Sequence, residues 1–214
     1  MEFLNLFCVL FIVRLINEPE PPLYDDELVE KAKEGDRAAF DILYNKYKRP
    51  ILNYIYRLIG DIHQAEELTQ ETFIRVYTNI GRYVKKTKFS SWVYTIAGNL
   101  AKNYLRDTSY VQKVSIDKSI DEEEGASLHD LLEDHTKRPD NAALKNEAEK
   151  LIQQGLEKLK QKHRKVIVLC DIQGLSYEDA AKALGCPPAT VGSRLSRARE
   201  KLAKVLGFTK PEVK

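Results

Sequence analysis

The chain has 214 residues, with 34 lysines and arginines against 32 aspartates and glutamates, so its formal net charge is only +2. Its length leaves room for one or two domains. Three cysteines without metal-type spacing indicate neither a zinc site nor a disulfide framework, and this usage fits a reducing cytoplasm. A Gly-rich phosphate loop and a nucleophile motif are also absent, so we expect no enzyme, no cofactor and no small-molecule substrate.

An apolar extension occupies residues 1–23, with the run FLNLFCVLFIVRLI near its start. This run is shorter than the roughly 20 residues that span a bilayer. Glu2 stands where a signal peptide carries basic residues, and no small-residue cleavage site follows. Three interpretations stay open: a start site placed too early or a dispensable extension, a helix that packs on the protein, and a contact with a membrane.

Residues 24–107 are predicted to form a first unit of about four helices, because no strand-like alternation interrupts them. Pro50 is expected to restart the chain within the second helical segment. Ser90 or Ser91 is expected to cap the last helix. Aspartates are expected to begin the other helices, since their carboxylates accept bonds from the first free amides. These aspartates are the pair Asp25 and Asp26, then Asp36 and Asp61.

A loop rich in cations and aromatic rings is expected after Gly81. Its basic residues are Arg82, Lys85, Lys86 and Lys88, and the aromatic residues among and after them are Tyr83, Phe89, Trp92 and Tyr94. Cations neutralise phosphates and aromatic faces stack on unpaired bases, so the loop suits single-stranded DNA. For Phe89 and Trp92 we favour the alternative that helix-spaced aromatic rings pack in the core.

Residues 108–140 are predicted to be an acidic, flexible linker. Within residues 116–136 there are eight acids and one lysine, and helical periodicity is lost. A plain solvated spacer explains this composition. The alternative is that the acids mask basic surfaces elsewhere in the chain.

Residues 141–208 are predicted to form a second unit of four helices, followed by a tail at 209–214. Ser176 and Asp179 have the spacing of a capping box, and Gly185 suits the left-handed end of a short helix. Two prolines, Pro187 and Pro188, then begin a longer helix. A short helix, a tight turn and a longer helix make a helix-turn-helix pattern, whose second helix enters the DNA major groove. An interaction-only helical hairpin is the alternative.

The longer helix has two different faces. Its apolar residues recur at steps of four and three: Val191, Leu195, Ala198, Leu202 and Val205. The opposite face carries small and basic residues, so it can approach DNA closely and hydrogen-bond base edges.

Three stretches in this order resemble extracytoplasmic-function (ECF) sigma factors of the bacterial sigma-70 family: QAEELTQETFIRVY, FSSWVYTIAGNLAKNYLR and GLSYEDAAKALGCPPATVGSRLSRAREKL. The resemblance implies an all-α fold in which a sigma2-like bundle and a sigma4-like helix-turn-helix unit are joined by the linker. It implies a sigma factor that directs promoter-specific initiation by RNA polymerase. The implied partners are the β′ clamp helices and β flap of the polymerase core, promoter DNA and an anti-sigma factor, which could hold the chain at the membrane.

The resemblance also implies three sets of binding residues. Those for the −35 element are Thr190, Ser193, Arg194, Ser196, Arg197 and Arg199, of which Thr190, Arg194 and Arg199 would hold phosphates. Those for the −10 element are Arg82, Tyr83, Lys85, Lys86, Lys88, Asn99, Lys102 and Asn103. Those for core polymerase are Glu66, Glu67, Gln70 and Glu71, with Leu68 directed inward.

Two positions depart from the family pattern. Gly192 stands where Lys or Arg is common, and Thr95 where arginine is common. Both departures affect promoter contacts rather than the family resemblance. A stand-alone helix-turn-helix regulator is the remaining alternative, although it leaves the basic-aromatic loop unexplained.

Overall fold

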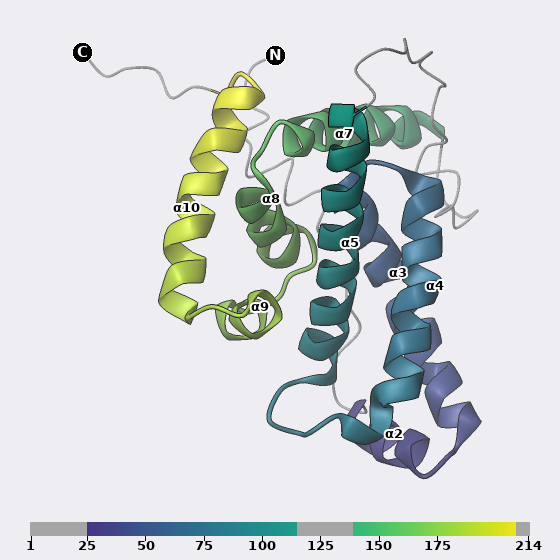
Figure 1. Cartoon of the computed structure of the whole chain (residues 1–214). Helices are drawn as coiled ribbons and strands as arrows, with labels where there is room; N and C mark the ends of the chain where they lie inside the picture. Colours follow the sequence, from purple (N-terminus) through teal and green to yellow (C-terminus); the bar gives the residue numbers. More distant parts are fainter. Residues whose placement is uncertain (1–24, 115–138, 209–214) are drawn as a thin grey trace. The chain divides into compact units, whose positions relative to one another are not determined.

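The computed structural model describes residues 25–114 and 139–208, and these form two compact units (Figure 1). The described residues contain helices and no strand, which confirms the all-α prediction. None of these helices has the length and apolar character needed to cross a bilayer. The predicted apolar extension, residues 115–138 of the linker and the tail lie outside the described residues.

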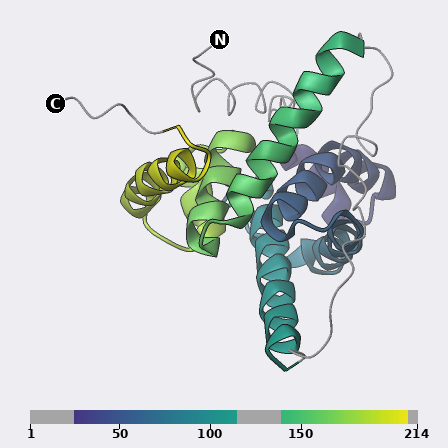
Figure 2. The same cartoon turned by 90° about the horizontal axis from the view of Figure 1, so that it is seen from above.

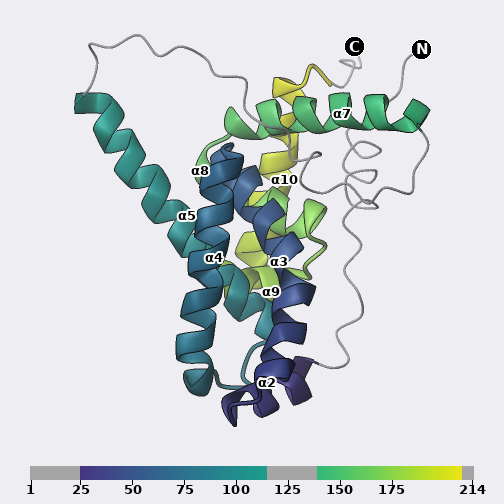
Figure 3. The same cartoon turned by 90° about the vertical axis from the view of Figure 1, so that its right-hand side faces the viewer.

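Within residues 25–114 the first unit has four α-helices and one short 3₁₀ turn: α2 (Asp25–Lys33), α3 (Arg37–Ile59), α4 (Ile62–Asn79), η1 (Ile80–Arg82) and α5 (Phe89–Val114). Helices α3 and α4 run side by side, with α2 at their base (Figure 3). The carboxylate of Asp36 accepts bonds from the amides of Ala38 and Ala39, and that of Asp61 from the amide of Gln64. The predicted caps at Asp36 and Asp61 are therefore confirmed. Helix α2 begins at Asp25, whose carboxylate accepts bonds from Lys46 and Tyr47 of α3.

The predicted restart at Pro50 is wrong, because α3 continues through this residue. A proline inside a helix costs about 3 kcal/mol. Here the residues on both sides of it, including Tyr47, Ile51 and Ile55, are buried in the core. We attribute the unbroken helix to this packing, which offsets the lost backbone bond.

Helix α5 extends beyond its predicted limits at both ends. It begins at Phe89, and the amide of Trp92 bonds to the carbonyl of Lys88 at 3.3 Å, so neither Ser90 nor Ser91 is the cap. It ends at Val114, inside the range predicted as linker. Each added residue brings one more backbone bond once a helix has formed, which explains elongation without an apolar pattern.

Edge-to-face aromatic contacts join the helices of the first unit. Tyr44 of α3 lies 4.8 Å from Phe73 of α4, and Tyr54 of α3 lies 5.1 Å from Tyr94 of α5, measured between ring centroids. Such pairs add to the free energy gained from apolar burial. This packing holds α3, α4 and α5 together. One face of α4 and the loop before α5 lie outside the core.

The second unit contains α7 (Pro139–Glu157), α8 (Gln161–Ile167), the π-helical turn η2 (Val168–Ile172), α9 (Tyr177–Leu184) and α10 (Pro188–Val205). Helix α7 is the long green helix in Figure 2. The hydroxyl of Ser176 accepts a bond from the amide of Asp179 at 3.1 Å, and Gly185 ends α9 with a φ of 63°. The predicted helix-turn-helix is formed by α9 and α10, which pack against each other.

Candidate nucleic-acid interface

Helix α10 buries one face and exposes the other, as its pattern predicts. Four of its apolar residues, Val191, Leu195, Ala198 and Leu202, are buried. On the outer face Ser193, Ser196 and Arg197 are exposed, while Thr190 and Arg194 are half-buried. The Ser193 hydroxyl donates to the Thr190 carbonyl at 3.2 Å. Small side chains on the outer face let its arginines approach base edges and phosphates.

Arg199, unlike the arginines on the outer face of α10, pairs with a carboxylate of the same unit. Its Nε lies 2.9 Å from Oδ2 of Asp171 and its second guanidinium nitrogen 2.5 Å from Oδ1, so the pair is bidentate. The Asp171 carboxylate, which is buried in η2, raises the pKa of Arg199 through these bonds. Arg199 therefore links α10 to η2. No local pattern reveals this link, because the partners are 28 positions apart. Its expected contact with a phosphate stays a prediction, since its side chain is 42% exposed.

The loop between η1 and α5 presents its basic side chains to solvent. Arg82, Lys85, Lys86 and Lys88 are all exposed. Nζ of Lys85 lies 3.1 Å from Oδ2 of Asp26 in α2. Between these cations Val84 is 61% exposed, a feature that sequence reasoning missed because valine is commonly a core residue.

The buried position of Tyr83 corrects one expectation, that its ring stacks on a base. It is only 4% exposed, and its ring packs 5.8 Å from that of Phe89 and 5.3 Å from that of Trp92. Burial raises the pKa of Tyr83. A ring covered in this way has no free face on which a base could stack. The core position favoured for Phe89 is confirmed, since its side chain is 1% exposed, and Trp92 is half-buried.

Helix α5 carries the other residues expected near the −10 element. Asn99, Lys102 and Asn103 are exposed, whereas Leu100 and Ala101 between them are buried. Spacings of three and four place these three polar side chains on one helix face. At the position where the family pattern has arginine, the hydroxyl of Thr95 donates to the Ser91 carbonyl at 2.8 Å.

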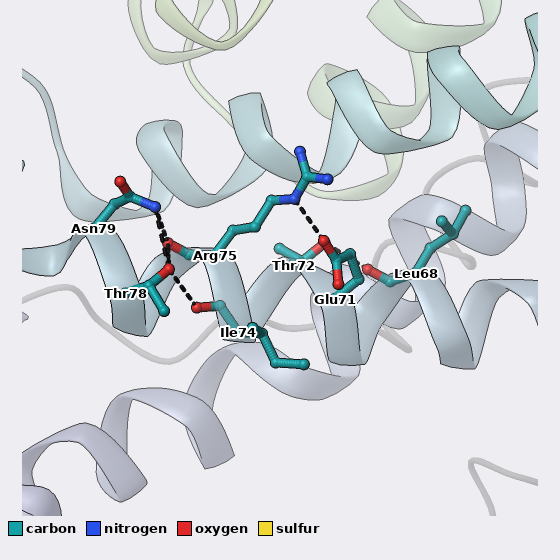
Figure 4. A network of polar contacts seen from close by, with 7 residues as sticks. All are labelled: Leu68, Glu71, Thr72, Ile74, Arg75, Thr78 and Asn79. Atoms are coloured by element: carbon teal, nitrogen blue, oxygen red, sulfur yellow. Dashed lines mark hydrogen bonds and ion pairs between the residues drawn. The ribbon is translucent and has the colours of Figure 1, made fainter.

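Helix α4 presents the predicted polar face, of which Glu67 and Gln70 are exposed and Glu66 and Glu71 half-buried. Glu71 pairs with Arg75, whose Nε is 2.7 Å from Oε1, while hydroxyls of Thr72 and Thr78 bond to carbonyls one turn earlier (Figure 4).

The same helix also exposes two large apolar side chains. Ile74 is 58% exposed and Tyr77 49% exposed. Ile74 follows Gln70 by one turn, so it continues the polar face that includes Glu67. Sequence reasoning missed this apolar extension because both residue types suit the interior of a helical bundle equally well.

Comparison with known proteins places both units. The model of Sigma-70 region 2 matches residues 43–110, and that of Sigma-70, region 4 matches residues 149–202. The RNA polymerase sigma-H factor of Pseudomonas aeruginosa is 37% identical over 85% of this chain and 93% of its own length. The ECF RNA polymerase sigma factor SigW of Bacillus subtilis is 35% identical over 83% of this chain and 94% of its own length. The structure of CnrH in complex with the cytosolic domain of CnrY shares the fold, with a TM-score of 0.62 at 23% identity over 87% of this chain and 99% of that chain.

Proposed function

Because this chain belongs to the ECF sigma factors of the bacterial sigma-70 family, we propose that its two helical units divide promoter recognition between them. The chain is an RNA polymerase sigma factor that directs promoter-specific initiation. It is a dissociable specificity subunit without catalysis of its own, and it acts in the cytoplasm. The observation that carries the division of labour is that each unit exposes one cationic surface of a different kind.

The second unit reads duplex DNA at the −35 element. The outer face of α10 combines small side chains with Arg194 and Arg197, while its other face is buried against α8 and α9. We assign Ser193, Ser196 and Arg197 to base edges, and Thr190 and Arg194 to phosphates.

The first unit binds the −10 element, where the strands separate. The exposed cations of the loop, Arg82, Lys85, Lys86 and Lys88, suit a phosphate backbone. The polar face of α5, with Asn99, Lys102 and Asn103, continues this surface along the DNA. Binding free energy gained only with unpaired strands favours the opened promoter.

Helix α4 docks on core polymerase. Its polar residues, Glu66, Glu67, Gln70 and Glu71, are joined by the exposed Ile74 and Tyr77, so charge and apolar area lie on one helix. Protein interfaces combine apolar and polar contacts in this way. We assign the β′ clamp helices as the partner of α4 and the β flap as the partner of the second unit.

A protein regulator is the remaining partner. CnrH was solved in complex with the cytosolic domain of CnrY, and this chain shares its fold. We extend this arrangement to the present chain and propose that an anti-sigma factor controls it, holding it at the membrane when that regulator is membrane-bound.

The direct test is in vitro transcription with bacterial core polymerase and a library of promoter templates. We expect the purified chain to form a holoenzyme and to select templates that share −10 and −35 sequences. A stand-alone helix-turn-helix regulator would instead bind palindromic DNA tightly without polymerase. If no template supports initiation and no complex with core forms, the proposal is refuted.

Reversing one charge on α4 is expected to weaken core binding. Glu71→Lys places a cation on an acidic face and should lower the affinity for core polymerase roughly tenfold. The exposed pair with Arg75 contributes only about 0.3–0.5 kcal/mol, so the fold should remain stable.

Fluorescence titration with labelled core polymerase measures this change. The matched control is Glu34→Lys, the same charge reversal at an exposed position in the turn that follows α2. Equal affinities for Glu71→Lys and wild type would remove Glu71 from the interface.

A further inference from the structure

The loop that follows η1 is closed by a single buried tyrosine. The hydroxyl of Tyr83 donates a hydrogen bond to the carbonyl of Thr87, so one side chain spans the loop from its first residue to its far end. Below this bond the Tyr83 ring is fixed by the rings of Phe89 and Trp92. We call the Tyr83–Thr87 bond the clasp. Both of its ends are anchored, because Thr87 lies two residues before α5 begins at Phe89.

Backbone bonds continue the same closure. The amide of Tyr83 bonds to the carbonyl of Ile80 at 3.0 Å, and the amide of Lys86 bonds to the carbonyl of Val84 at 2.7 Å. The stretch VKKT contains neither glycine nor proline. The conformation of this stretch is therefore not imposed by the backbone preferences of glycine or proline. It depends instead on contacts made by neighbouring residues.

Helix α2 supports the clasp from the other side. Nζ of Lys33 lies 5.5 Å from the centroid of the Tyr83 ring, a cation–π distance. Asp26 holds Lys85 at 3.1 Å. Helix α2, which carries no expected DNA contact, thus contacts both the Tyr83 ring and the Lys85 side chain of the loop.

The result is a loop that is ordered inside and cationic outside. Fixing the backbone of one residue costs about 1–2 kcal/mol of conformational entropy. A loop ordered before DNA arrives does not lose that free energy on binding, which raises its affinity for an unpaired strand. Tyr83, which is 4% exposed, contributes to this without reaching the DNA.

We propose that Tyr83 is a positioning residue for −10 recognition, and that its clasp on Thr87 holds residues 84–88 in the conformation that captures an unpaired base. The proposal rests on the sigma-factor function above. It assigns the contacts with the opened strand to the exposed residues of the loop, among them Val84, and assigns the geometry of the loop to the buried hydroxyl.

The test removes this hydroxyl and keeps the ring. Tyr83→Phe holoenzyme is titrated with a forked promoter fragment whose −10 non-template strand is unpaired and carries 2-aminopurine, whose fluorescence reports unstacking. We expect about three- to tenfold weaker binding than wild type, the range that corresponds to one lost hydrogen bond. Core affinity and binding to −35 duplex should be unchanged.

A second measurement follows the loop without DNA. Hydrogen exchange at the amides of residues 84–88 should be faster in free Tyr83→Phe than in wild type. The control is Tyr44→Phe, which removes a hydroxyl from a half-buried tyrosine of α3 and should change neither readout.

Three outcomes would overturn the assignment. Fork binding within twofold of wild type means that the clasp does not position the loop. Weaker binding with unchanged exchange makes the hydroxyl a direct DNA contact, and loss of the thermal unfolding transition makes it a folding determinant. Failure of the sigma-factor function is distinguishable, because wild-type protein would then form no holoenzyme.

Discussion

Replacing Arg199 with alanine is expected to lower the free energy of unfolding of the second helical unit by about 2 kcal/mol. The change leaves the Asp171 carboxylate, 8% exposed, without its bidentate partner. Removing one member of a buried pair costs roughly 3–5 kcal/mol. The Arg199 side chain is 42% exposed, so water reaches the vacated position and the expected loss is smaller.

Hydrogen exchange across α8 and α10 measures this loss in the full chain. Adding Asp171→Asn to Arg199→Ala should recover part of the stability, because a neutral amide is less costly to bury than a carboxylate.

The matched variant is Arg197→Ala, two positions earlier on the exposed face. It should leave stability unchanged and cost about 1–3 kcal/mol of discrimination at one −35 base pair. The two arginines thus have opposite expected phenotypes. If Arg199→Ala keeps its stability and binds all −35 sequences equally poorly, Arg199 is a phosphate contact, as the family resemblance implied.

The second large effect is expected from Gly155→Val, which should destabilise the second unit by about 2 kcal/mol through overpacking. Gly155 lies inside α7, against the end of α10. A Cβ atom at this position would be 2.8 Å from Cδ1 of Leu202 and 2.8 Å from Cδ2 of Leu206. The two methyl groups of valine enlarge this overlap and force the leucines or the helices apart.

Gly192 of α10 is the matched control, since it is also a glycine inside a helix. Its nearest neighbour outside α10 would be Cε2 of Tyr177 at 3.6 Å from an added Cβ, an ordinary contact. Gly192→Ala should therefore stabilise the unit by about 1 kcal/mol. Thermal unfolding separates the two, with a shift of roughly 4–8 °C per kcal/mol for a unit of this size. Equal shifts for both glycines would contradict a close approach at Gly155.

Local chemistry explains which predictions were confirmed. The caps at Asp36, Asp61 and Ser176 bond to amides two or three residues away, so the residues that decide them are adjacent in the sequence. The apolar stripe of α10 follows from helix periodicity in the same way. From these elements the family resemblance predicted a sigma-factor function, which the comparisons support.

The sequence did not reveal the tertiary partners of Arg199 and Tyr83, because these partners come from elsewhere in the fold. Arg199 was expected on phosphate, but its carboxylate partner is 28 positions away in a different element. Tyr83 was expected to stack on a base, but residues in the first turn of α5 cover its ring. For both residues the side-chain chemistry suits either role.

The sequence by itself therefore determined two capped helical units, a helix-turn-helix and a cationic loop, because hydrogen bonds and periodicity over a few residues are sufficient for each. Only the tertiary structure decided that α3 passes through Pro50, that a side chain at Gly155 would overlap those of Leu202 and Leu206, and which cations face solvent. These outcomes depend on packing between segments distant along the chain, where burial and an opposing charge outweigh local preference.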